Sequence, residues 1–377
     1  MVRMRILEVS YTDPECHCGG VEDFILNLII QMTKKGHEVT CIFSQYTLPN
    51  STEVDYRKIN IFNIKKPRAA ILSLMHKIVY NIAILLYVTI HRKEFDAIHI
   101  NGDNGIFLPL FYGSKSVATF FGMPIFRVRE TYKNTHSVKN LPRLVIALIS
   151  SLIHVPSILF SKFVVADNPQ IRGILNIFRD FKSVKLVYNG VDNKAFKRLT
   201  IEEKRVLRKE LGMDVDKKYA IWVGNDAKGY GQDVAFYIAM KHKQDLNLLS
   251  IGAHSSLQSD NIIQLGRLDH NTLAKYMGAS DFMIFPQRYP GISLSMVSAM
   301  LSGLKVVTFS KYISDFFTTD NVFFATTPDD MEKIVSKILE NPAMIDTCSK
   351  PTDPVLQEFY PENCAKKYLD LYEGLYE

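Results

Sequence analysis

Residues 285–307, with the sequence FPQRYPGISLSMVSAMLSGLKVV, contain the pattern that decides the fold. A short apolar run ends before Pro290, and apolar residues then recur at helical spacing from Leu294 onward. Gly303 stands where the C-terminal cap of a helix belongs, and a β-branched run begins at Val306. The pattern therefore predicts a strand, a loop, a helix and a second strand. A loop of this kind points backbone N–H groups and the positive end of the helix dipole at its ligand, which suits an anion such as a nucleotide diphosphate.

The same alternation of strand and helix signals runs along the whole chain. The first series has predicted strands at 6–10 and 39–43, with a glycine-containing loop and a helix at 21–35 between them. A second series begins with a predicted strand at 219–223. Strands that alternate with helices are typical of parallel sheets covered by helices. The sequence therefore predicts an α/β protein with two doubly wound, Rossmann-like domains.

A turn separates the two series. Asn189-Gly190-Val191-Asp192 interrupts the pattern, and a polar, charged helix follows it. We therefore expect an N-terminal domain over residues 1–192 and a C-terminal domain over residues 193–357. One more helix is expected within 358–377, after a proline-rich link.

The composition excludes several classes of protein. The chain has 377 residues, of which 47% are hydrophobic and 22% charged, as in a well-packed protein of two domains. The net charge of +6 comes from dispersed basic residues, so we expect no nucleic-acid partner. The five cysteines are too few and too scattered for a disulfide framework, and the first residues lack the pattern of a signal peptide. We therefore expect a reducing, cytoplasmic location.

Two long apolar segments, 71–90 and 144–160, lie among basic residues. His76, Lys77 and Asn81 interrupt the first segment, and the second is short, so neither has the composition of a transmembrane helix. Two interpretations remain open. Both segments are buried helices of an α/β domain, or they form an apolar, cationic face that rests peripherally on an anionic membrane.

The residues from 289 to 307 also resemble a known signature. They are similar to the donor-sugar signature of the retaining glycosyltransferases of family 4, which have the GT-B fold. Pro290 and Ser298 stand where relatives have two glutamates. The resemblance implies two domains that face each other across a cleft, with the last helix packed back on the N-terminal domain. The matching residues are Tyr289, Gly291, Leu294, Ala299, Met300, Gly303, Val306 and Val307.

The resemblance extends to further loops. Gly19-Gly20 resembles a loop that faces the donor diphosphate, and two glycines let the backbone approach a ligand closely. Relatives have an arginine and a lysine in the loop that opens the donor domain, where they neutralise the departing diphosphate. In this chain Asn225 and Tyr230 occupy those positions, and Lys228 is either a replacement charge or a solvated loop lysine. The donor-binding residues implied are Gly224, Asn225, Lys228, Tyr230, Arg267, Pro290, Gly291, Ile292, Ser293, Leu294 and Ser298.

The N-terminal domain offers a candidate catalytic residue. Asp103 follows a predicted strand, at the carboxyl end of the sheet where ligands bind, and it is either an acid/base or an ordinary turn aspartate. Phe121 stands where relatives have a histidine near the reacting sugar. Cys16-His17-Cys18 has no second Cys/His pair with zinc spacing, and the chain lacks the metal-binding Asp-x-Asp. We expect neither a metal site nor a cofactor.

These observations lead to two hypotheses. The first is a metal-independent glycosyltransferase that moves a sugar, with retention, from a nucleotide-sugar donor to a glycan or lipid-linked acceptor. The second is a weak or inactive homologue that binds nucleotide or glycan, or supports a partner enzyme. The substitutions at Asn225, Tyr230, Pro290, Ser298 and Phe121 motivate the second. The side chains do not identify the donor base, the sugar or the linkage.

Overall fold

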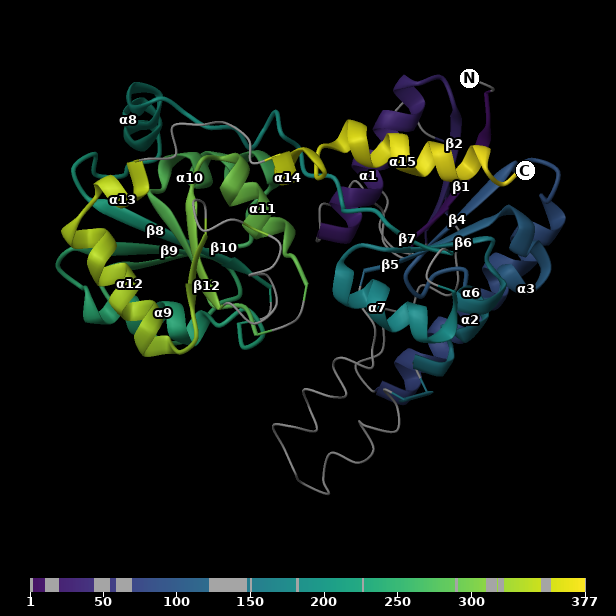
Figure 1. Cartoon of the computed structure of the whole chain (residues 1–377), viewed down its shortest axis with the longest axis horizontal. Coiled ribbons are helices and arrows are strands. Elements are labelled where there is room, and N and C mark those ends of the chain that lie inside the picture. Colours follow the sequence, from purple (N-terminus) through teal and green to yellow (C-terminus); the bar gives the residue numbers. More distant parts are fainter. Residues whose placement is uncertain are drawn as a thin grey trace. The chain divides into compact units, whose positions relative to one another are not determined.

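The computed structural model describes residues 3–10, 20–43, 55–58, 70–121, 148–149, 151–180, 183–225, 227–288, 291–309, 317, 322–346 and 354–376. The predictions made for 16–18, Gly19, Tyr289 and Pro290 fall outside these residues. The chain divides into two compact units (Figure 1). Unit 1 contains residues 1–190 and 361–377, and unit 2 contains residues 191–360.

Unit 1 is built on a parallel sheet of seven strands in the order β3-β2-β1-β4-β5-β6-β7. Its central strands are buried along their whole length, as expected where helices cover both faces of a parallel sheet. Its elements are β1 (Arg5–Val9), α1 (Gly20–Lys34), β2 (Glu38–Phe43), β3 (Asp55–Lys58), α2 (Ala70–Ile90), β4 (Ala97–Asn101), α3 (Pro109–Tyr112), the 3₁₀ turn η2 (Gly113–Lys115), β5 (Ser116–Phe120), α6 (Val155–Phe160), β6 (Phe163–Ala166), α7 (Pro169–Phe178), β7 (Val184–Leu186) and α15 (Pro361–Glu373).

Two hydrophobic clusters cover the two faces of this sheet. On one face α1 and the last helix, α15, pack together on the strands through residues such as Phe24 and Tyr368, whose ring centroids are 5.8 Å apart. On the other face α2, α3, α6 and α7 form the second layer, with buried residues such as Tyr80, Ile158 and Leu175. The last 17 residues of the chain, 361–377, thus belong to unit 1, although unit 2 separates them from it in sequence.

Unit 2 is built on a parallel sheet of six strands in the order β10-β9-β8-β11-β12-β13. On one face α9 and α12 pack over a cluster that includes Trp222, and α8 and α10 contact each other beside the same sheet. Its elements are α8 (Ile201–Glu210), β8 (Lys218–Gly224), α9 (Gln232–Lys241), β9 (Leu246–Gly252), β10 (Ile262–Gly266), α10 (His270–Ala279), β11 (Phe282–Phe285), α11 (Leu294–Leu301), β12 (Lys305–Phe309), β13 (Val322–Ala325), α12 (Pro328–Glu340), α13 (Ala343–Asp346) and α14 (Pro354–Gln357).

Local sequence signals set the ends of several helices. Thr200 caps α8 and Thr327 caps α12, each in a capping box with an acidic residue three positions later. Asn168 accepts a hydrogen bond from the N–H of Ile171 at the start of α7, and Asp269 does the same for Thr272 in α10. These caps satisfy backbone donors that have no partner within their helices.

In both units the strand order reverses direction once, and ligands of doubly wound proteins bind at such a point. The reversal lies between β1 and β4 in unit 1, and between β8 and β11 in unit 2. The order of unit 2 corresponds to the 3-2-1-4-5-6 arrangement of a Rossmann domain. The structure thereby confirms the predicted fold class of two doubly wound α/β units.

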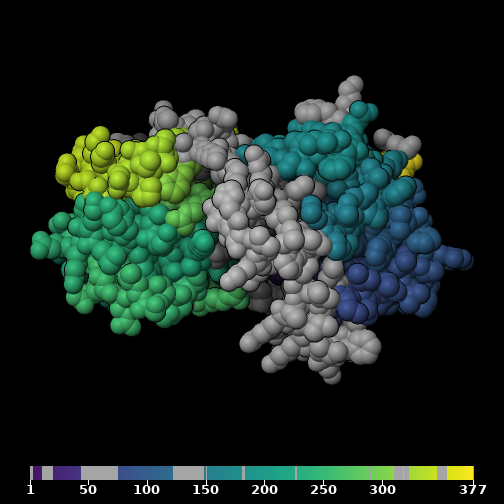
Figure 2. Space-filling view, turned by 90° about the horizontal axis from the view of Figure 1, so that it is seen from below, coloured from purple at the N-terminus to yellow at the C-terminus, as the bar shows by residue number. Residues whose placement is uncertain are grey.

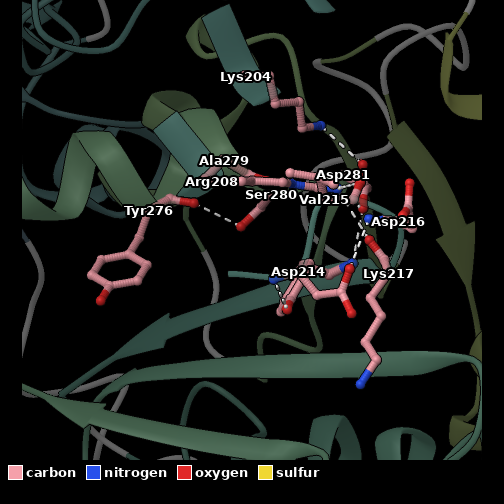
Figure 3. Close-up of polar contacts among 11 residues, drawn as sticks. Lys204, Arg208, Asp214, Val215, Asp216, Lys217, Tyr276, Ala279, Ser280 and Asp281 are labelled. Atoms are coloured by element: carbon pink, nitrogen blue, oxygen red, sulfur yellow. Dashed lines mark hydrogen bonds and ion pairs between the residues drawn. The ribbon is translucent and has the colours of Figure 1, made fainter. Parts of the chain in front are cut away.

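A buried charge cluster lies at the amino ends of the strands in unit 2, opposite their carboxyl ends (Figure 3). Asp281 directly precedes β11, and its carboxylate receives Arg208 Nη2 at 2.8 Å and Lys204 Nζ at 2.9 Å. The N–H of Tyr219 at the start of β8 donates to the same carboxylate at 2.8 Å. Burial opposes ionisation of Asp281, but the two cations and this backbone N–H outweigh it and lower its pKa. The cluster joins α8 to the amino ends of the strands, at the end of the sheet opposite the carboxyl ends.

Candidate functional site

The carboxyl ends of β8 and β9 come close together in unit 2. The carbonyl oxygen of Gly224, the last residue of β8, accepts a hydrogen bond of 2.7 Å from the N–H of Ala253. Gly252 has a positive φ of 104°, and a Cβ at this position would lie 2.3 Å from the Gly224 oxygen. A side chain therefore does not fit at Gly252, and backbone atoms of Gly224 and Gly252 form the surface where β8 and β9 end.

The loop after β8 bends back over the sheet. The carbonyl of Tyr230 accepts a hydrogen bond of 2.9 Å from Trp222 Nε1. The Tyr230 ring stacks on the ring of Phe285, with centroids 5.5 Å apart. The same ring fills the space beside Gly224, where a Cβ would lie 2.9 Å from it. Tyr230, predicted as a donor-binding residue, thus packs into the base of the loop. It offers an aromatic surface where relatives are expected to have a lysine charge.

Gly231 joins this loop to the residues that follow β11. It has a positive φ of 69°, and a Cβ there would lie 2.3 Å from the carbonyl oxygen of Pro286. The two segments that flank the reversal point, 224–231 and 286–294, are therefore in direct contact. Eight of the predicted residues lie on these two segments: Gly224, Asn225, Lys228, Tyr230, Gly291, Ile292, Ser293 and Leu294.

Arg288 reinforces this contact and was not among the predicted residues. Its guanidinium donates to both carboxylate oxygens of Asp233 at 2.8 Å, and Nη1 also donates to the carbonyl of Lys228 at 2.7 Å. The N–H of Arg288 donates to the carbonyl of Gly229 at 2.9 Å. Burial tends to raise the pKa of Asp233, but Arg288 lowers it overall. An arginine three positions beyond an apolar strand is a weak sequence signal, because its partners lie some 55 to 60 positions earlier.

Two further basic side chains line the same edge at different distances from the reversal point. Lys228 is exposed beside the ion pair of Arg288 with Asp233, so the two cations exceed the one carboxylate and leave this part of the edge positively charged. Arg267 follows β10, which is separated from β8 by β9, and its side chain is exposed. The structure therefore places Arg267 on the predicted edge but two strands away from the reversal point.

The start of α11 lies at the end of the 286–294 segment. Gly291 has a positive φ of 113°, and its carbonyl accepts a hydrogen bond of 2.7 Å from the buried side chain of Gln287. Ser293 is the N-cap residue, and its side chain makes no capping hydrogen bond. The first N–H groups of a helix have no intrahelical partner and attract anions. Ser298 lies one turn further on and is 5% exposed.

In unit 1 the loop after β4 is held by α2. Asn81, 1% exposed in the middle of α2, accepts hydrogen bonds from the N–H groups of Gly105 at 2.6 Å and Ile106 at 2.9 Å. Its amide nitrogen donates to the carbonyl of Asp103 at 3.0 Å. The carboxylate of Asp103, the candidate catalytic residue, forms an ion pair with Lys77 of α2. Asp103 thus lies at the predicted edge, already paired with a cation.

The other predictions for unit 1 concern residues that follow the strands β1 and β5. Gly20 is the first residue of α1 and is exposed, whereas its neighbour Gly19 is outside the described residues. Phe121, in place of the family histidine, packs edge-on against Phe24 with ring centroids 5.2 Å apart. The side chain at this position therefore joins the hydrophobic cluster beside α1.

Asp167, at the carboxyl end of β6, is a further residue that the sequence analysis missed. Its Oδ1 accepts a hydrogen bond of 2.6 Å from Asn168 Nδ2, and the side chain of Asn189 also donates to this carboxyl. Burial raises the pKa of Asp167 to about 7, and these amides offset only part of that rise. No ion pair of Asp167 is found within the described part of the chain. A carboxyl whose pKa is raised to about 7 at the carboxyl end of a doubly wound sheet is a candidate functional group.

Two family models match the chain, one in each unit. The model described as Glycosyltransferase Family 4 matches residues 18–194, and the model described as Glycosyl transferases group 1 matches residues 218–341. No curated protein matches the chain.

Solved structures share the fold over nearly the whole length. Sucrose-phosphate synthase from Thermosynechococcus elongatus is similar with a TM-score of 0.80 and 17% identity, covering 99% of both chains. WaaG, a glycosyltransferase involved in lipopolysaccharide biosynthesis, is similar with a TM-score of 0.73 and 11% identity, covering 98% of this chain and 100% of its own. HepE from Anabaena, in complex with UDP and glucose, is similar with a TM-score of 0.70 and 13% identity, covering 99% of this chain and 100% of its own.

Proposed function

Because the chain belongs to the group 1 glycosyltransferases of family 4 and has the GT-B fold, we propose that it moves a sugar from a nucleotide sugar to a glycan or lipid-linked acceptor, with retention. The observation that carries this proposal is the contact between segments 224–231 and 286–294 at the reversal point of unit 2. The reaction needs no cofactor and no metal ion in this proposal. The nucleotide sugar is a substrate.

The edge of unit 2 has the chemistry that a nucleoside diphosphate needs. The unpaired N–H groups at the start of α11 attract the phosphates, and the backbone at Gly224 and Gly252 allows close approach. Lys228 adds positive charge beside the ion pair of Arg288 with Asp233, where we propose that the diphosphate leaves. Groups that are already in place when charge develops on a leaving group lower the barrier most effectively.

The missing glutamates change how strongly the donor is held. Ser298 is able to bind a ribose hydroxyl only through a neutral hydrogen bond of about 1 kcal/mol, against roughly 1.5–3 kcal/mol for a bond to a carboxylate. We therefore expect weaker donor binding than in relatives that have the glutamate, by about tenfold. HepE has been crystallised with UDP and with UDP-glucose, so uridine nucleotide sugars are the first donors to test here.

The location proposed for this activity is the cytoplasm, with peripheral attachment to the inner membrane face. The acceptor is then a precursor on a lipid carrier or at the cell surface. No helix among the described residues is long and apolar enough to cross a membrane.

The experiment is a donor screen with purified full-length protein. Nucleoside diphosphate release is measured for a panel of nucleotide sugars with acceptor extracts present, and calorimetry measures binding of each nucleotide. Arg288→Gln is expected to weaken nucleotide binding about tenfold, while the control Lys243→Gln, an exposed residue paired with Asp260, leaves it unchanged.

Tight nucleotide binding without turnover of any donor contradicts the proposed transfer. In that case the Pro290→Glu, Ser298→Glu double variant distinguishes two causes. Turnover by this variant alone assigns the loss to the missing carboxylates and makes the natural chain a binding homologue.

A further inference from the structure

Helix α2 is apolar on both of its sides. Tyr80, Ile84 and Val88 are fully buried against the sheet of unit 1. The opposite side exposes a continuous stripe at helical spacing, with Met75 57%, Val79 42%, Ile82 45%, Leu86 61% and Ile90 79% exposed. A helix that is hydrophobic all round is normally covered on all sides, by protein or by lipid. The first interpretation of this segment, a buried helix, therefore accounts for only half of its surface.

The three neighbouring helices of the same layer extend this apolar surface. Fourteen of the twenty exposed large hydrophobic residues among the described residues lie on α2, on α3, α6 and α7, or at 148–152 before α6. Apart from the α2 stripe they are Leu110, Phe111, Leu148, Ile149, Leu152, Leu159, Phe160, Ile177 and Phe178. We call the exposed apolar residues of α2, α3, α6 and α7 the apolar face. Figure 2 shows α2 in blue and α6 and α7 in teal on the same side of unit 1.

Hydrogen bonds join the four helices into one layer. Tyr112 of α3 donates to Thr89 of α2 at 3.1 Å. The N–H of Lys162, just after α6, donates to the carbonyl of Gly113, just after α3, at 2.9 Å. Arg179, just after α7, donates to the carbonyl of Ser161 at 2.5 Å. The apolar residues are therefore neighbours on one surface, and an exposed apolar surface that is contiguous marks an interaction site.

Basic residues outnumber acidic residues on and beside the helices of this layer. None of the four helices contains an aspartate or a glutamate, whereas α2 contains Lys77 and α7 contains Arg172. Each helix is also followed within three residues by a basic residue: Arg92 and Lys93, Lys115, Lys162 and Arg179. Of the acidic residues nearby, Asp103 pairs with Lys77, Glu94 pairs with His91 and Asp96 pairs with Arg5. Asp180 follows Arg179. Part of this arrangement also suits the helix dipoles, because cations stabilise helix C-termini.

We propose that the apolar face docks on the surface of an anionic lipid bilayer, as a monotopic contact. The exposed leucine, isoleucine and phenylalanine side chains enter the headgroup region, and the exposed basic residues Arg92, Lys93 and Lys115 meet lipid phosphates. The lack of acidic residues on the four helices selects a negatively charged membrane over a protein surface of mixed charge. A second copy of the chain would place the basic helix ends of two identical surfaces beside each other, which opposes self-association.

The test is flotation of the full-length protein with vesicles. Vesicles with phosphatidylglycerol and phosphatidylcholine are compared with vesicles of phosphatidylcholine alone, at low and high salt. We expect binding to the anionic vesicles that weakens with salt. Ile90 is 79% exposed and Phe111 is 69% exposed. We expect Ile90→Glu and Phe111→Glu each to reduce the vesicle partition coefficient at least tenfold.

Ile201→Glu is the matched control, because Ile201 lies on α8 of unit 2 and is 80% exposed. It carries the same change at the same exposure, and we expect it to bind vesicles like the unmodified protein. Circular dichroism and thermal unfolding show that each variant is folded.

Three results overturn the proposal: no flotation with anionic vesicles, equal loss in all three variants, or a dimer that Ile90→Glu dissociates while no vesicle binds. Nucleotide binding by calorimetry is measured on the same samples. Since the apolar face is in unit 1 and the proposed phosphate site is in unit 2, failure of vesicle binding with intact nucleotide binding leaves the proposed transfer standing.

Discussion

The hydroxyl oxygen of Tyr372, in the last helix of the chain, lies 2.9 Å from Nδ1 of His99 in β4. The same hydroxyl donates to Oε1 of Glu8 in β1 at 3.3 Å, and His99 Nδ1 lies 2.8 Å from that oxygen. On its other side His99 contacts Thr119 of β5, at 2.7 Å from Nε2 to Oγ1. All four side chains are fully buried, so α15 is attached to three strands by a polar network inside unit 1.

Removal of the Tyr372 hydroxyl should destabilise unit 1. Burial, with Glu8 nearby, raises the pKa of Tyr372 well above its usual value, so the hydroxyl keeps its proton and donates. Tyr372→Phe leaves the Glu8 carboxylate short of a donor, and we expect a loss of about 1–3 kcal/mol in the free energy of unfolding. Urea denaturation measures this. Tyr376→Phe, at a position 65% exposed, is the control and should stay within about 0.5 kcal/mol of the unmodified protein.

Loss of Asp281 should destabilise unit 2 more strongly. Asp281→Ala leaves Arg208, which is 6% exposed, as a buried cation without its carboxylate. Such a change is expected to cost about 3–5 kcal/mol. Asp260→Ala also removes an ion pair, with Lys243, but Asp260 is 91% exposed and the expected loss is below about 1 kcal/mol. Similar losses in the two variants would show that the Asp281 cluster is not the main link of α8 to the sheet.

Gly231→Ala should weaken nucleotide binding in addition to stability. An alanine at Gly231 meets the carbonyl oxygen of Pro286 and pushes segment 224–231 away from segment 286–294. Gly212 has nearly the same φ, 68° against 69°, but nothing within 4 Å of a Cβ. Gly212→Ala therefore reports the cost of the backbone conformation alone, about 1–2 kcal/mol.

The comparison of these two glycine variants isolates the effect of the contact. Calorimetry with uridine nucleotides should show at least tenfold weaker binding for Gly231→Ala and unchanged binding for Gly212→Ala. Unchanged nucleotide binding in both variants would show that the nucleotide does not bind at segments 224–231 and 286–294.

Asp167 should make the stability of unit 1 depend on pH. Its pKa is about 7 in the folded protein, against about 3.9 for an unperturbed aspartate. The folded state therefore binds more protons than the unfolded state between these values, and the free energy of unfolding falls as pH rises from about 4 to 7.

Asp167→Asn removes this dependence. From pH 5 to pH 8 the variant should gain more than about 1.4 kcal/mol in stability relative to the unmodified protein, measured by urea denaturation. Tyr368 and Cys364, whose pKa values are also raised by burial, stay neutral over this range and do not contribute. A difference between the two proteins that is constant with pH contradicts the raised pKa.

The sequence alone was sufficient for the fold class and for strands and helices of both units. The signals that decided them are local: the alternation of strands and helices, and a glycine or proline after several of the elements. Segment 285–307 contains the end of β11, the helix α11 and the start of β12, as predicted, and the parallel strands bring its loop to the edge shared with Gly224. The family models that match both units confirm the resemblance found in that segment.

Only the tertiary structure decided what individual polar side chains do. Arg288 and Glu8 have partners that come from distant parts of the chain, and neighbouring residues give no sign of them. The pKa of Asp167 is raised by burial, which its neighbours in sequence do not reveal either. Tyr230 occupies a position where relatives have a charge, yet its ring lies against Gly224 and Phe285 because the loop bends back over the sheet. Periodicity reveals which face of a helix is apolar, but it does not reveal which apolar face stays exposed among the residues that the structure describes. For α2 that distinction appeared only when the sheet had covered one side of the helix and left the other exposed.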